Sequence, residues 1–159
     1  MKISLTWIDI AVLAGSSLFA VMTYSFDSTE KIPFADKYWV LESSSITPAI
    51  DLDMDGKADT DIRVMMEDCE RDDAEMFKSG GKIMKHDGYK RCDEEEEQVT
   101  ESGSWTYDAS TKQLTSKHHS TSTPQTVLVK EVSATKMTVQ YSFTSNKGKH
   151  TIHAVYKVK

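Results

Sequence analysis

The chain of 159 residues is long enough for one ordinary domain and too short for two. Hydrophobic residues make up 38% and charged residues 28%, which supplies material both for a buried core and for a hydrated surface. The formal net charge of -6 argues against nucleic acid as a partner. Two cysteines are too few for a disulfide-dense scaffold or a four-cysteine zinc site.

The charges are distributed unevenly along the chain. Residues 51–101 carry 18 acidic and 8 basic side chains, whereas residues 102–159 carry 2 acidic and 8 basic ones. Two interpretations follow. The two regions complement each other across one fold, or the acidic side chains lie on solvated loops.

The N-terminal segment has the composition of a targeting sequence. Asp9 is the single charged residue within 3–26, and the uncharged run 10–26 is 17 residues long. As a helix this run spans roughly 25 Å, which is marginal for a bilayer core, and it is long for the apolar part of a signal peptide. Residues 1–26 are therefore predicted to be a signal peptide or a membrane anchor, with a buried helix as the third interpretation. Residues 27–35 are predicted to be a linker.

The rest of the chain is predicted to form short strands joined by turns. Gly80-Gly81 supplies the positive φ angles of a tight turn between strands at 75–78 and 82–86. A short helix is predicted within 60–70, after the first strand. The pattern indicates an all-β fold, an eight-stranded antiparallel up-and-down barrel over 36–159. The remaining strands are expected at 38–41, 103–107, 113–117, 126–132, 137–143 and 152–158.

Alternation along the last two strands predicts which side chains share a face. Those on the first of the two are Met137, Val139, Tyr141 and Phe143, and those on the second are Ile152, Ala154, Tyr156 and Val158. We expect the aromatic side chains to form the barrel core rather than a ligand-binding group. They are Trp39, Trp105, Tyr107, Tyr141, Phe143 and Tyr156.

The segment 51–61 places acidic residues at alternate positions around Gly56, as a calcium-binding loop does. Calcium takes about six to eight oxygen ligands, and an ion there would hold the loop rather than perform chemistry. The position where an EF-hand has a bidentate glutamate is Ile62. The alternative is a turn whose carboxylates accept hydrogen bonds from nearby amides. The predicted ligands are Asp51, Asp53, Asp55, Asp59, Asp61 and the carbonyl of Lys57.

Cys69 and Cys92 are predicted to form a disulfide. They flank the hairpin at 75–86, and an exported chain with two cysteines usually pairs them. Closing a loop of this size contributes roughly 3 kcal/mol to stability. A metal-binding pair is the alternative.

A spread pattern of strands, turns and cysteines runs through residues 36–159. It consists of Trp39-Val40-Leu41, the loop 51–61, Cys69 to Asp73, Phe77, Gly80-Gly81, Cys92, Gly103-Ser104-Trp105 and Tyr156-Lys157. This pattern resembles the small secreted lipocalin-like domains of bacteria. The resemblance implies a small β-barrel with an apolar cavity, and it implies neither a reaction nor particular ligand-contacting residues. One departure is Lys37, where lipocalins usually have glycine two positions before the first-strand tryptophan.

No arrangement of residues in the sequence indicates catalysis. The adjacent His118 and His119 point to opposite faces of a strand, and the acidic run 93–97 is typical of a solvated loop. We therefore expect a non-enzymatic protein without an obligatory cofactor, exported to the periplasm, the envelope or the medium. The first hypothesis is a barrel that binds a small apolar molecule, with ligand-binding residues unidentified. The alternative is a structural or interaction protein with a filled barrel. Calcium is compatible with both.

Overall fold

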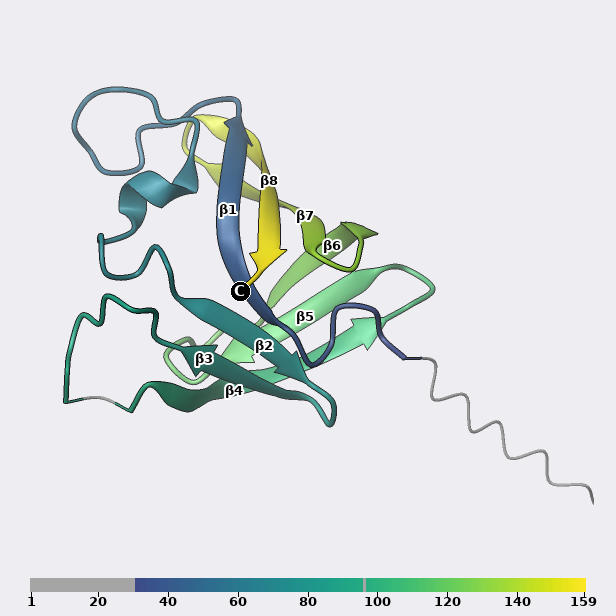
Figure 1. Cartoon of the computed structure of the whole chain (residues 1–159). Coiled ribbons are helices and arrows are strands. Elements are labelled where there is room, and N and C mark those ends of the chain that lie inside the picture. The colour runs from purple at the N-terminus through teal and green to yellow at the C-terminus, as the bar shows by residue number, and fades with distance from the viewer. Residues whose placement is uncertain (1–30, 96) are drawn as a thin grey trace, which may run out of the picture. The chain divides into compact units, whose positions relative to one another are not determined.

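The computed structural model describes residues 31–95 and 97–159. Within them, eight antiparallel strands pair in sequence order and close into a barrel, which confirms the predicted all-β up-and-down fold (Figure 1). The strands are β1 (Tyr38–Thr47), β2 (Ala74–Lys78), β3 (Lys82–His86), β4 (Val99–Asp108), β5 (Gln113–His118), β6 (Gln125–Val132), β7 (Lys136–Ser145) and β8 (Gly148–Val158).

The predicted signal peptide or anchor at 1–26 lies outside the described residues, as do residues 27–30 of the predicted linker. Among the residues that are described, no helix has the length and apolar character needed to cross a membrane.

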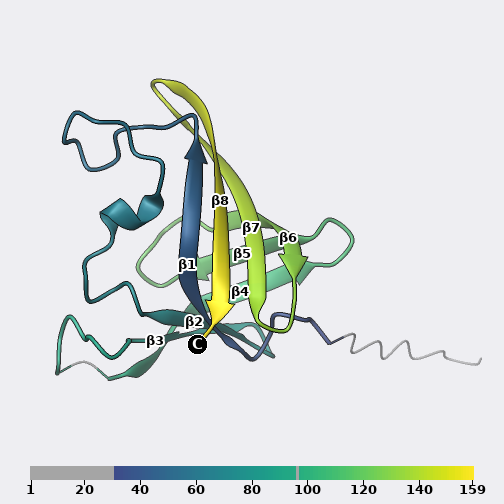
Figure 2. The same cartoon turned by 45° about the horizontal axis from the view of Figure 1, so that its top comes forward.

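The barrel closes because β1 pairs with strands on both sides. Trp39 lies opposite Glu75 of β2 and opposite Val158 of β8. The ladder between β1 and β8 continues to the pair Thr47 and Thr151, with one register shift that lets the strand bend. Figure 2 shows β1, β8 and β7 side by side as three long neighbouring strands. Closure gives the sheet an inner face that only side chains fill.

Glycines act at two close points of the sheet. Gly80 and Gly81 form the turn between β2 and β3 with φ angles of +98° and +87°, as the sequence predicts. A Cβ atom at Gly103 on β4 would lie 2.2 Å from the carbonyl oxygen of Lys117 on β5. A side chain at Gly103 would therefore force β4 and β5 apart, whereas at Gly80 and Gly81 the positive φ angles disfavour other residues.

The short helix predicted within 60–70 does not form as an α-helix. A single 3₁₀ turn, η1 (Ile62–Met65), follows Asp61, and Met66 is extended with φ -92° and ψ 133°. Val64 and Met65 remain 40% and 57% exposed. A short helix is stable only when one face packs against the protein, and of the apolar residues of this turn only Ile62 packs against a core cluster.

The main core lies at the end of the barrel where the N-terminal segment enters. Phe34 is fully buried, and its ring lies 5.7 Å from Phe77 and 5.0 Å from Tyr107 between centroids. The indole nitrogen of Trp39 donates a hydrogen bond of 2.8 Å to the carbonyl oxygen of Phe34. Phe34 and the neighbouring buried residue Ala35 belong to the segment 27–35 that was predicted to be a linker. The end of that segment is instead part of the barrel core, because burying the apolar ring of Phe34 at the end of the barrel stabilises the fold.

A second apolar cluster lies where β1, β7 and β8 extend together beyond the main core. Ile46, Ile50 and Ile152 are buried there. His150 is buried beside them, with Nδ1 2.8 Å from the carbonyl oxygen of Pro48 and Nε2 2.9 Å from the hydroxyl of Ser145. Both ring nitrogens of this histidine are occupied, so it has a structural role.

The predicted disulfide between Cys69 and Cys92 is present. It ties the segment that follows η1 to the loop between β3 and β4, with 5.2 Å between the two Cα atoms. Since the sulfurs are bonded to each other, the alternative of a metal-binding cysteine pair is wrong.

The complete burial of Phe34 predicts that Phe34→Ala strongly lowers the stability of the fold. Removing a fully buried phenylalanine should lower the free energy of unfolding by about 3–5 kcal/mol, as measured by urea denaturation. Tyr89→Ala is the control, because Tyr89 is 92% exposed and its contact with Lys159 contributes about 1 kcal/mol at most. Equal losses in the two variants would contradict the role of Phe34.

Candidate functional site

A cavity of about 120 Å³ lies in the interior of the barrel. Phe34 does not line this cavity itself, but it packs against the lining residue Phe77. Three lining residues, Ser116, His118 and Gln125, also border an open depression of about 600 Å³ at the loop between β5 and β6. The cavity therefore has its mouth at that loop. Its lining consists of Trp39, Glu75, Phe77, Leu114, Ser116, His118, Gln125, Val127, Met137, Val139, Tyr141 and Tyr156.

Strand alternation explains this lining. Glu75 and Phe77 are two apart on β2, as are Ser116 and His118 on β5, so each pair shares the inner face. The predicted common face of Met137, Val139 and Tyr141 also lines the cavity. The six aromatic residues predicted to form core all pack with the two apolar clusters: Tyr141 and Phe143 with the second cluster and the other four with the main cluster. Three of them, Trp39, Tyr141 and Tyr156, also border the cavity.

A carboxylate and an imidazole face each other across the cavity. Oε1 of Glu75 lies 3.6 Å from Nδ1 of His118, slightly beyond hydrogen-bond length. Burial raises the pKa of Glu75, and the nearby His118 and Lys85 oppose that shift only in part. Burial also raises the pKa of the Tyr156 hydroxyl, with smaller contributions from Glu75 and Tyr141. The site therefore disfavours ionisation of its acidic groups.

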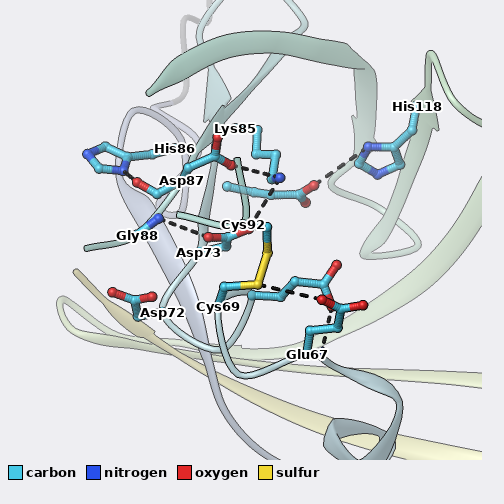
Figure 3. A network of polar contacts seen from close by, with 12 residues as sticks. Glu67, Cys69, Asp72, Asp73, Lys85, His86, Asp87, Gly88, Cys92 and His118 are labelled. Carbon is cyan, nitrogen blue, oxygen red and sulfur yellow. Dashed lines mark hydrogen bonds and ion pairs between the residues drawn. A yellow bond between two sulfur atoms is a disulfide. The ribbon is translucent and has the colours of Figure 1, made fainter. Parts of the chain in front are cut away.

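The positive charge nearest to Glu75 on β3 is already neutralised. Nζ of Lys85 lies 2.7 Å from Asp87 and 3.2 Å from Asp73. Figure 3 shows this ammonium group between the two carboxylates, with His118 directed toward the same region from its own strand. The hydrogen bond to Asp87 raises the pKa of Lys85, so the lysine stays charged and committed to this pair. Two carboxylates around one ammonium group leave the surroundings of Glu75 negative.

Glu75 and His118 were not singled out as site residues from the sequence. His118 and His119 were predicted to point to opposite faces, and this is confirmed, since His118 lines the cavity and His119 is exposed. Glu75 stands two positions before the apolar Phe77, which is the signal that alternation offered. A pair formed by strands 43 positions apart in sequence becomes visible only with the register of the barrel.

The aspartate loop gathers part of the predicted ligand set. Carboxylate oxygens of Asp51, Asp53 and Asp59 all lie within 4.8 Å of one another. Oδ1 of Asp51 is buried and, among the described residues, has no hydrogen-bond partner. The loop also contains the hydrogen-bonded turns of the alternative interpretation, because the amide of Gly56 donates to Asp51 and the amide of Asp55 to Asp53.

The other predicted ligands are directed elsewhere. Asp55 accepts from the amide of Lys57 at 2.8 Å and lies 3.4 Å from its ammonium group. Asp61 accepts from Arg63 and from the hydroxyl of Ser44, both at 2.6 Å. Burial raises the pKa of Asp61, but these hydrogen bonds outweigh it and hold the pKa at about 2. Asp61 thus anchors η1 to β1.

Comparison of the chain with protein-family models, with curated proteins and with solved structures found no match. The cavity and the loop are therefore interpreted from their own chemistry.

The calcium prediction is tested with neutral variants of the loop. Asp53→Asn removes a carboxylate of the gathered set and keeps an oxygen for the amide of Asp55. Asp55→Asn is the control, because its carboxylate is directed to Lys57. We expect calorimetric titration with calcium to show binding to the wild-type chain, weakened about tenfold or more in Asp53→Asn and retained in Asp55→Asn. Absence of heat in the wild type would leave the turns as the full explanation of the loop.

The raised pKa of Glu75 predicts a pH-dependent effect of Glu75→Gln on stability. A raised pKa means that ionised Glu75 destabilises the fold at neutral pH, and that this cost disappears as the pH falls below its folded pKa. Glu75→Gln should therefore raise the Tm at about pH 8 and change it little at about pH 4. Glu101→Gln is the control of opposite sign, because the hydrogen bond from Lys82 lowers the pKa of Glu101. A drop in Tm for Glu75→Gln at pH 8 would contradict the assignment.

Proposed function

We propose that this protein is an exported, lipocalin-like barrel that binds a small, largely apolar molecule in its interior without catalysing a reaction. The observation that carries the proposal is the cavity of about 120 Å³, which is lined partly by aromatic side chains and opens at the loop between β5 and β6. Binding sites are typically concave and mostly apolar, with a few converging polar groups. The cavity has this composition.

The size of the cavity limits the ligand. An engineered protein cavity of about 150 Å³ takes up benzene, so about 120 Å³ suits a molecule with roughly one ring. A larger ligand would extend through the mouth, past Ser116 and Gln125, into the open depression beyond. The lipocalin-like assignment is supported by the closure of consecutive antiparallel strands and by the residue pattern that carries the resemblance.

Export is supported by the disulfide between Cys69 and Cys92, because such bonds persist in oxidising compartments. The composition of residues 1–26 supports the same proposal. A calcium ion held by Asp51, Asp53 and Asp59 would stabilise the loop after β1 in an extracellular setting.

The second candidate is a structural or interaction protein with a filled barrel. The observation that favours it is the same volume, since ligand sites commonly reach about 300 Å³ or more and this cavity is smaller. In that case the cavity is a packing defect and the function lies on the outer surface.

The two candidate functions are distinguished by a variant whose larger side chain fills the cavity. Ser116→Leu places a larger apolar side chain on the inner face, and Ser104→Leu makes the same change at an exposed position of β4. We expect the wild-type chain and Ser104→Leu to bind toluene, followed by chemical-shift changes of the Trp39 indole, and Ser116→Leu to lose at least tenfold in affinity. Failure of the wild type to bind toluene, together with higher stability of Ser116→Leu, would favour the filled barrel.

A further inference from the structure

A purely apolar ligand does not explain Glu75. Its side chain borders a cavity lined partly by aromatic rings, where an ionised group loses part of its hydration, and it remains 42% exposed. Within the described residues this carboxylate has an ion pair at 3.6 Å with His118 and no hydrogen bond. Its oxygens are therefore accessible and keep acceptor capacity for a ligand.

The surroundings of Glu75 suit a positive charge. Trp39 lies directly opposite Glu75 in the sheet, and Phe77, Tyr141 and Tyr156 border the same cavity. The faces of aromatic rings attract cations, and desolvation strengthens this attraction. A carboxylate among aromatic rings is therefore a suitable receptor for an ammonium group attached to an apolar body.

The protein's own cations do not satisfy this receptor. Lys85 on β3 is held by Asp73 and Asp87. Lys37 lies 5.7 Å from the Trp39 ring, but its ammonium group donates to the carbonyl oxygen of Ala134 outside the cavity lining. The imidazole of His118 on β5 is the one group facing Glu75 that competes directly, and it does so only when it is protonated.

We propose, building on ligand binding in the barrel, that the ligand is a small organic cation whose ammonium group pairs with Glu75 while its apolar body occupies the cavity. The negative surroundings formed by Asp73 and Asp87 attract such a cation toward the site. An anionic amphiphile is repelled by the same groups, and a neutral one leaves Glu75 without a partner.

The inference is tested with three probes of equal size, namely benzylamine, benzyl alcohol and benzoate, titrated calorimetrically into the full chain at about pH 7.5. We expect the ammonium form of benzylamine to bind about 10- to 100-fold more tightly than benzyl alcohol, the range of a charge-assisted hydrogen bond, and benzoate to bind least. Glu75→Gln should bring the amine to the affinity of the alcohol. Glu101→Gln, which removes a charge that is bonded to Lys82 on the exterior, should keep the preference.

The pH provides a second measurement that needs no variant. Burial raises the pKa of Glu75, so lowering the pH to about 5.5 favours its neutral form, and the amine should lose affinity while the alcohol keeps it. Equal affinities of amine and alcohol, unaffected by Glu75→Gln or pH, would overturn the inference and leave ligand binding intact. Binding of none of the probes, toluene included, would overturn the proposed function itself.

Discussion

The pairing of β1 with β8 is the constraint on which the rest of the structure depends. It turns a meander of hairpins into a closed sheet with an inside, and every second residue of each strand must then fill that inside. The aromatic ring of Phe34 occupies one end, and large residues on β1, β7 and β8 occupy the middle. The small cavity is the volume that these side chains leave, and closure brings Glu75 and His118 to its wall from separate strands.

Closure also explains where the acidic residues lie. Six acidic side chains of the described part of 51–101 form ion pairs with basic ones of the same segment, as in Asp61 with Arg63 and Asp68 with Lys90. Among the ion pairs of the described residues, Glu75 with His118 is the exception that joins this segment to the basic C-terminal region. The two halves therefore do not neutralise each other across the fold. The single ion pair between this acidic segment and the basic C-terminal region lies at the cavity.

The sequence allowed the strands to be predicted because a half-buried strand repeats every two residues and its turns are marked by glycine. It allowed the disulfide to be predicted from cysteine count and compartment. The helix predicted within 60–70 was wrong, since only Ile62 of the turn that forms there packs against the core, while Val64 and Met65 are exposed. The burial of Phe34 was not predicted, because Phe34 belongs to no periodic element and its partner Phe77 is 43 positions away. The lining of the cavity could be predicted only in part. Alternation identifies which residues of one strand share a face, whereas the register between strands decides which residues of different strands meet on it.

The two candidate functions make opposite demands on Glu75. A barrel whose interior serves only as a core gains nothing from a carboxylate there, because an apolar side chain would fill the same space without a desolvation cost. A barrel that binds a polar head group needs one acceptor that the protein itself leaves unsatisfied, and desolvation then strengthens the contact with the ligand. Glu75 has the second set of properties: it faces a cavity, it stands opposite an aromatic ring, and the nearest lysine is held by other carboxylates. In the proposed function, the residue that destabilises the fold is thus the one that would select the ligand.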